Sequence, residues 1–341
     1  MKRGLALIAA AAAALLAVAA AGAKSNDTTI TGAGSTFVSP LVSVWTPAVG
    51  SAFGYNLNYA PVGSGAGINA ISSRTVDFGA SDAPLTADQF AGCHSCVQIP
   101  WALGATAIIY NIPGAPVHMH LSGKVIADIY LGHVTSWSDP EIKALNPGAN
   151  MPDLKITPVY RSDGSGTTYN FTDYLSAVSP EWKSKVGNST TVQFPAGVGA
   201  KGSSGVTGVV SQTQGGVTYA DVAFALKNHL HFAAIRTRAG RFVYPSLRRI
   251  KEAASTIMKV PANNEMHIVA PAKKFPTAYP ISTFTYVILP QQTSHAAELR
   301  RLVFWALTQG QQSQYTAKLL FAPIPKVVLF AAEKTLKTVH T

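Results

Sequence analysis

The stretch Arg161-Ser162-Asp163-Gly164-Ser165-Gly166-Thr167 places a fixed cation, a carboxylate and a turn of small residues directly before a predicted helix. Apolar residues then recur at i, i+3, i+4 and i+7 on one helix face: Phe171, Tyr174, Leu175 and Val178. The N–H groups at a helix N-terminus attract anions, and glycine lets the backbone approach a ligand closely. The Arg161 guanidinium suits a phosphate-like oxyanion. Taken alone, the stretch fits equally a capped loop with an Arg–Asp pair at the surface.

Two more turns of small residues occur far away along the chain, at residues 31–37 and 63–67. The run 76–82 has the pattern of a buried strand that ends in the carboxylate of Asp82. Strands and helices alternate, which predicts an α/β fold with a parallel or mixed sheet and helices on both faces. Ligands of such folds lie beyond the carboxyl ends of strands. The three turns, Arg161 and Asp82 therefore predict an oxyanion site between two lobes.

Local signals predict further elements. Pro47 is expected to kink or end the first helix, and Thr86 with Gln89 fits a capping box for a later one. We interpret the glycine-rich stretch 197–205 as a flexible loop. Residues 236–275 contain many arginines without clear periodicity, and we interpret them as a solvated face.

Residues 1–23 have the features of a cleaved export signal. Lys2 and Arg3 precede an apolar run, and Ala21-Gly22-Ala23 supplies small residues at the −3 and −1 positions. The run is at or just under the length that spans a bilayer, so a membrane anchor is the alternative. We predict export and cleavage near Ala23, without a lipid anchor because no Cys lies near that point.

Length and composition fit a compact exported protein. About 318 of the 341 residues remain after cleavage, which is enough for two domains. Only 13% of residues are charged and 28 are Gly, which favours a folded chain with many tight turns. Loss of Lys2 and Arg3 lowers the formal net charge from +11 to +9, and this charge favours anionic partners. We predict no nucleic-acid partner, because the basic residues are scattered.

Cys93 and Cys96 are the only cysteines. In an exported protein we expect them to form a structural disulfide that closes a short loop. A thioredoxin-like pair requires a helix directly after the motif, but residues 97–100 have an extended pattern. A zinc site would need two more ligands at matched spacing. We predict no metal and no cofactor.

A secreted phosphatase or esterase is the first rival function, because several serines lie in glycine-rich turns. However, the best match to a G-x-S-x-G elbow, residues 79–83, lacks the last glycine, and no Walker A lysine follows either turn. The pairs His118/His120 and His229/His231 have strand-like spacing, and we expect them to be exposed side chains and not metal ligands. The second rival is a binder of sulfate or molybdate, and the third is a secreted adhesion protein that uses its positive surface.

Several motifs in one order carry a family resemblance. They are residues 31–37, 62–67, 76–84, 128–132, 137–139, 145–148, 161–167, 199–205 and 279–289. In this order the chain resembles the periplasmic phosphate-binding proteins that supply the phosphate-specific ABC transporter. The match is thin across 236–275 and at the extreme C-terminus. The resemblance implies a class II binding-protein fold with two α/β lobes, each a mixed sheet flanked by helices, joined by two hinge strands.

The resemblance also implies where the lobes and the ligand lie. Lobe I takes residues 24–105 and 280–341, lobe II takes 106–279, and the hinge candidates lie near 105–110 and 279–285. The phosphate ligands fall on positions that keep the expected residue type: Thr36, Phe37 (through its N–H), Ser64, Asp82, Arg161, Ser165, Gly166 and Thr167. Asp163 matches the carboxylate that pairs with the arginine.

A member of this family binds inorganic phosphate in the periplasm and interacts with the membrane permease subunits of a phosphate ABC transporter. We expect a monomer without enzymatic activity. Asp82 makes chemical sense beside an anion only if the ligand carries a proton. A carboxylate can accept a hydrogen bond from hydrogen phosphate, whereas fully ionised sulfate leaves a buried acceptor unpaired. We therefore predict that Asp82 rejects sulfate.

Overall fold

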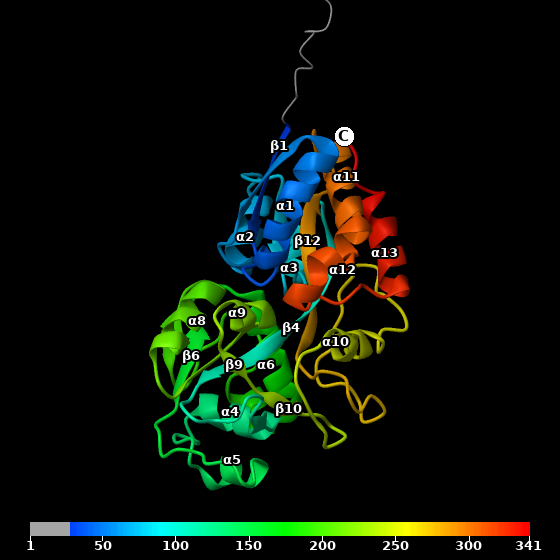
Figure 1. Ribbon diagram of the computed structural model, residues 1–341. Helices are drawn as coiled ribbons and strands as arrows, with labels where there is room; N and C mark the ends of the chain where they lie inside the picture. The colour runs from blue at the N-terminus through cyan, green and yellow to red at the C-terminus, as the bar shows by residue number, and fades with distance from the viewer. Residues whose placement is uncertain (1–27) are drawn as a thin grey trace, which may run out of the picture.

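The computed structural model describes residues 28–341 (Figure 1), so the predicted export signal lies outside the described residues. Strands and helices alternate through the first half: β1 (Thr28–Gly34), α1 (Ser39–Phe53), β2 (Tyr55–Ala60), α2 (Ser64–Ser72), β3 (Phe78–Ser81), α3 (Ala87–Gly92), β4 (Cys96–Asn111), β5 (His120–Leu121), α4 (Gly123–Leu131), α5 (Pro140–Leu145), β6 (Thr157–Arg161), α6 (Gly166–Val178) and α7 (Pro180–Lys185).

The second half continues this order: β7 (Val198–Ala200), α8 (Gly202–Gln212), β8 (Gly216–Asp221), α9 (Val222–Lys227), β9 (His231–Phe232), β10 (Ala234–Arg236), β11 (Phe242–Val243), α10 (Leu247–Ala254), β12 (Ser282–Pro290), α11 (Ala296–Leu307), η1 (Gln309–Gln311), α12 (Ser313–Thr316), η2 (Ala317–Leu319) and α13 (Lys326–Leu336). Among residues 28–341, no helix has the length and apolar character needed to cross a membrane.

The large sheet has the strand order β2-β1-β3-β12-β4-β8-β6-β7, with β9 also paired to β4. The pairs β1–β2, β1–β3, β6–β8 and β6–β7 are parallel. β12 and β4 run antiparallel to their neighbours. A small sheet contains β11, β10 and β5. The predicted α/β fold with a mixed sheet is therefore confirmed.

The long strand β4 belongs to two bodies. Its residues up to Ala105 pair with β12, and from Thr106 onward they pair with β8. Figure 1 shows β4 passing from a terminal body, which carries α1, α2, α11 and α13, into a central body, which carries α4, α6, α8 and α9. All β4 residues from Ile99 to Tyr110 are buried, since both bodies cover this strand.

Each body has an aromatic cluster in its core. In the terminal body, Trp45 packs edge-on against Trp101 with ring centroids 5.4 Å apart. In the central body, Phe171 stacks on Tyr219 at 4.2 Å. Aromatic pairs of this kind contribute about 0.5–1.5 kcal/mol beyond the burial of their area. The two clusters stabilise the bodies whose strand ends meet at the candidate site described below.

The structure excludes one of the two expectations for the first helix, that it ends at Pro47. Pro47 lies inside α1, which continues to Phe53. Pro47 is exposed, whereas Leu41, Trp45 and Val49 on the opposite face are buried. The buried face thus keeps the helix intact on both sides of the proline. The predicted capping box of α3 is confirmed, because both hydrogen bonds between Thr86 and Gln89 are present.

The stretch 197–205 is not a flexible loop. Val198–Ala200 forms strand β7 on β6, and Gly202 starts the 11-residue helix α8. Long-range contacts order these glycines: a Cβ on Gly197 would lie 2.4 Å from the Pro158 carbonyl oxygen, and the backbone there has φ 111°. Residues 236–275 likewise contain β10, β11 and α10, whose Ile250 is buried.

The expectation that all four histidines are exposed is half right. His229 and His231 are exposed. His118 and His120 are half-buried, because their rings stack on Tyr244 at 4.0 Å and on Phe242 at 4.1 Å, respectively. The aromatic partners come from a hairpin about 120 residues away, which the spacing of the histidines does not reveal.

Candidate functional site

The turn after β1 is organised around the hydroxyl of Ser35. This hydroxyl donates a hydrogen bond to the Asp82 carboxylate and accepts the Phe37 N–H at 3.0 Å. Only glycine fits at position 34, where φ is 143° and a Cβ would lie 2.1 Å from the Ala80 carbonyl oxygen. The turn therefore lies tightly against the end of β3, and Asp82 follows that strand directly.

Ser64 opens helix α2 and is buried. Its hydroxyl lies 3.4 Å from the Asp82 backbone N–H, which it accepts. Gly63 precedes it with φ 101°, a conformation that favours glycine. The second small-residue turn thus brings the N-terminus of a nine-residue helix to the same carboxylate.

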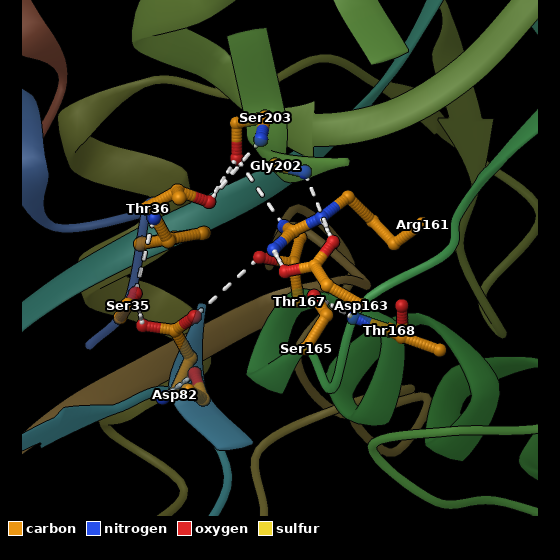
Figure 2. Close-up of polar contacts among 12 residues, drawn as sticks. Ser35, Thr36, Asp82, Arg161, Asp163, Ser165, Thr167, Thr168, Gly202 and Ser203 are labelled. Atoms are coloured by element: carbon orange, nitrogen blue, oxygen red, sulfur yellow. Dashed lines mark hydrogen bonds and ion pairs between the residues drawn. The ribbon is translucent and has the colours of Figure 1, made fainter. Parts of the chain in front are cut away.

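Arg161 ends β6 and is 5% exposed. Its Nε donates to Asp163 Oδ1 at 2.7 Å, and its Nη2 donates to Oδ2, so the two side chains form a bidentate pair (Figure 2). The Gly202 N–H also donates to Asp163, at 2.9 Å. Nη1 lies 3.5 Å from the hydroxyl of Ser203. Asp163 thereby fixes one edge of the guanidinium and leaves Nη1 for other acceptors.

Helix α6 follows with its N-terminus at the same place. Ser165 caps it by accepting the Thr168 N–H at 3.1 Å, and the Thr167 hydroxyl reaches the Asp82 carboxylate at 3.4 Å. Gly166 approaches the other body so closely that a Cβ would lie 2.5 Å from the Asp82 backbone nitrogen. The helix dipole and the Thr167 hydroxyl therefore point to the space between Arg161 and Asp82 (Figure 2).

Hydrogen bonds across this space hold the two bodies together. Thr36 Oγ1 and Ser203 Oγ lie 2.8 Å apart, and the Ser203 N–H donates to Thr36 Oγ1 at 3.2 Å. A third bond runs from the Gly65 N–H to the Gly164 carbonyl at 2.9 Å. Together with the Thr167–Asp82 contact, they describe a closed arrangement of the bodies.

Burial controls the protonation of the carboxyl groups. Burial raises the pKa of Asp82 to about 6, although hydrogen bonds from Ser35 and Thr285 and the charge of Arg161 oppose this shift. Burial also opposes ionisation of Asp163, but the hydrogen bonds and charge of Arg161 outweigh it and lower the pKa of Asp163. The site thus contains one firmly ionised pair and one carboxyl that titrates in a mildly acidic range.

This arrangement suits a protonated oxyanion. Arg161 and the helix N-termini stabilise negative charge, and the serine and threonine hydroxyls supply donors without adding net charge. Asp82 supplies the acceptor for a ligand proton. Within residues 28–341, no group of three or more His, Cys, Asp or Glu side chains is arranged to hold a metal ion.

Figure 2 shows Thr36 and Asp82 of the terminal body opposite Arg161, Ser165 and Thr167 of the central body. The other three predicted ligand positions adjoin this set: the Phe37 N–H is bonded to Ser35, the Ser64 hydroxyl to the Asp82 N–H, and Gly166 lies against the Asp82 backbone. Ser35 and Ser203 were missed as members of the site. Both lie in glycine-rich turns that the sequence marks, at 31–37 and 199–205, so the signal for them was present.

Cys93 and Cys96 lie apart from the site and form a disulfide with their Cα atoms 5.5 Å apart. Their sulfur atoms belong to a small core cluster with Ile68 and Ile71 of α2. Arg74 donates to the Cys93 and His94 carbonyl oxygens at 2.9 Å and so links the loop of the disulfide to the end of α2. The disulfide supports the far end of the helix that Ser64 opens.

A closed two-body α/β fold with a buried oxyanion site defines the class of periplasmic-type solute-binding proteins. A family model described as a PBP superfamily domain matches residues 19–308. The Phosphate-binding protein PstS of Xylella fastidiosa strain Temecula1 is 39% identical over 300 residues, covering 87% of this chain and 81% of that protein. PstS of Pasteurella multocida is 37% identical, and the match covers 91% of this chain and 90% of that protein. The chain belongs to the PstS family of phosphate-binding proteins.

Solved structures agree on the fold. The phosphate-bound periplasmic phosphate-binding protein PfluDING superposes with a TM-score of 0.72 at 20% identity, covering 90% of this chain and 93% of that one. A phosphate-binding protein from Stenotrophomonas maltophilia gives a TM-score of 0.67, also at 20% identity, with the same coverage. The family is one of binding proteins, and the rival function of an enzyme is set aside on that ground.

Proposed function

We propose that this protein is exported, captures hydrogen phosphate between its two bodies and delivers it to an ABC transporter for uptake. The observation that carries the proposal is the pairing of a buried cation with a buried, titratable carboxyl across one space. Arg161 lies on one side and Asp82 on the other, and hydroxyl and N–H donors fill the remaining directions. Few ligands other than a protonated oxyanion match both charges.

Eight residues would bind the phosphate: Thr36, Phe37, Ser64, Asp82, Arg161, Ser165, Gly166 and Thr167. Arg161 Nη1 and the N–H groups at the start of α6 would bind ionised oxygens. The Asp82 carboxylate would accept the hydrogen bond from the phosphate proton. Asp163 orients Arg161 without touching the ligand, because both its oxygens already accept bonds from the guanidinium.

Capture would proceed by closure of two lobes. We assign residues 24–105 and 280–341 to lobe I and 106–279 to lobe II. The change of β4 partner between Ala105 and Thr106 supports a hinge there, because that strand is common to both bodies. The Thr36–Ser203 bond forms only when the bodies meet, so it would stabilise the closed, loaded form.

The export signal predicted at residues 1–23 and the family support a periplasmic location, and we expect a monomer there. The membrane permease subunits of a phosphate ABC transporter would recognise the closed form. Relatives named for phosphate binding support this assignment over a role in adhesion.

Equilibrium dialysis of the stripped mature protein against labelled phosphate tests the first step. We expect one phosphate per protein, retention of binding in Arg241→Ala, which alters an exposed arginine, and its loss in Arg161→Ala. Uptake of the same label into vesicles that carry the permease tests delivery. A folded, stripped protein that binds no phosphate would overturn the proposal.

A further inference from the structure

Helices α11 and α13 lie side by side on the terminal body (Figure 1), and a groove lies between them, away from the proposed phosphate site. Its volume is about 370 Å³. The residues that carry the argument are Arg300, Arg301 and Phe304 of α11, and Glu333, Leu336 and Lys337 of α13. We call it the α11–α13 groove.

The two helices run antiparallel, which gives the groove two different ends. The Thr293 N–H, just before α11, donates to the carbonyl of His340, just after α13, at 2.9 Å. The start of α11 therefore lies beside the end of α13. On α13, Phe330 and Lys337 are seven residues apart and share one stripe of the helix. Phe330 does not line the groove but lies on α13 at the level of its Phe304 end, and Lys337 lies at the opposite end.

The first end of the groove is apolar and exposed. Phe304 is 51% exposed and Phe330 is 73% exposed. Among the residues that the structure describes, these are the two phenylalanines in the exposed class. Burial of such a side chain is favourable, and the described part of this chain leaves that gain unused. Aromatic side chains are enriched at the centre of protein interfaces.

The other end is cationic. Arg300, Arg301 and Lys337 are exposed, and none of them forms an ion pair within the described part of the chain. Glu333 is the one acidic side chain that lines the groove. Residues 296–341 as a whole contain six Lys or Arg against two Glu. The groove therefore complements a ligand with negative charge at one end.

We propose that the α11–α13 groove binds an acidic amphipathic helix of a partner protein. The partner would place an apolar side chain against Phe304, with Phe330 beside that end of the groove, and carboxylates beside Arg300, Arg301 and Lys337. These two ends are one to two helical turns apart, or roughly 5–10 Å. An apolar residue followed by Asp or Glu at i+4 and i+7 on one helix face matches this spacing.

Two features favour a protein helix over other anions. The groove is concave and lies between two helices, which suits a third helix better than a flat membrane surface. It also combines apolar walls with separated charges, which inorganic phosphate cannot use. The groove lies on one body only, so binding there leaves the hinge and the phosphate site free.

Selection of helical peptides from a displayed library on the phosphate-loaded mature protein tests the proposal. We expect the selected peptides to share an apolar residue with Asp or Glu at i+4 or i+7. The best peptide, fluorescently labelled, should bind at least tenfold more weakly to Phe304→Ser/Phe330→Ser and to Arg300→Glu/Arg301→Glu. Matched controls at other exposed positions, Met258→Ser and Lys273→Glu/Lys274→Glu, should leave its affinity unchanged.

Phosphate titration of each variant checks that it is folded, because the groove is separate from the phosphate site. Selected peptides without the apolar–acidic spacing, or equal binding by groove and control variants, would contradict the proposal. So would binding to anionic phosphatidylglycerol vesicles that the groove variants lose while no peptide binds, because this would assign the groove to a membrane. Dimerisation that the Phe variants abolish would assign it to a second copy.

Discussion

Replacement of Asp82 by Asn should admit sulfate. In the structure, Asp82 Oδ1 accepts the Ser35 hydroxyl, and Oδ2 accepts the Thr167 hydroxyl over a long 3.4 Å. A fully ionised sulfate offers this oxygen no proton, and an unsatisfied buried acceptor costs about 1–3 kcal/mol, more when it is charged. The amide of Asn can instead donate to a sulfate oxygen. The variant should therefore gain about 3 kcal/mol for sulfate, or roughly 150-fold in affinity.

Competition calorimetry of the stripped protein with sulfate and phosphate measures this gain. Asp221→Asn is the matched control. Asp221 is also a fully buried carboxyl, its pKa is raised well above the usual range by burial, and it accepts the Ala223 N–H at 2.9 Å. That variant should keep the parent's preference for phosphate. If Asp82→Asn discriminated against sulfate as strongly as the parent protein does, the proposed role of Asp82 in selecting a protonated ligand would be refuted.

Three further predictions concern closure and protonation. Gly166→Ala should weaken phosphate binding about 5- to 150-fold (about 1–3 kcal/mol), because the added Cβ would lie 2.5 Å from the Asp82 nitrogen in the closed form. An unchanged affinity in calorimetry would contradict this prediction. Ser203→Ala should speed phosphate release about fivefold (about 1 kcal/mol) through loss of the 2.8 Å bond to Thr36, and stopped-flow rates equal to the parent's would refute that bond's role. The pKa of Asp82 is raised from 3.8 in the unfolded chain to about 6 in the folded protein. Protonated Asp82 therefore adds to the free energy of unfolding of the stripped protein in full below pH 3.8, and this contribution is lost as the pH rises through 6. The free energy of unfolding of the parent should therefore fall by about 3 kcal/mol relative to Asp82→Asn between pH 4 and 8, and parallel pH profiles in denaturant would contradict the shift.

Much of the site could be predicted from the sequence because its residues lie in short local motifs. The stretch 161–167 encodes a strand end, a charge pair and a helix cap within seven residues, and each keeps that role in the structure. The turns at 31–37 and 63–67 are similarly local. Their meeting at Asp82 followed from the rule that ligands lie beyond the carboxyl ends of strands.

The errors arose where distant contacts decide the local structure. The glycines of 197–205 have low intrinsic order, but pairing of β7 with β6 and the bond from Gly202 to Asp163 fix them. Pro47 is a helix breaker by propensity, yet the buried face of α1 holds the helix together. Ser203 lies in a glycine-rich turn that the sequence marks, but its bond to Thr36 spans 167 residues of sequence and no local motif encodes it.

Calorimetric titration of the stripped mature protein with phosphate, beside Arg161→Ala and Arg241→Ala, tests the central claim most directly. We predict one phosphate bound per protein by the parent and by Arg241→Ala, and no measurable binding by a folded Arg161→Ala. Phosphate binding that survives intact in Arg161→Ala would place the ligand elsewhere and contradict the site.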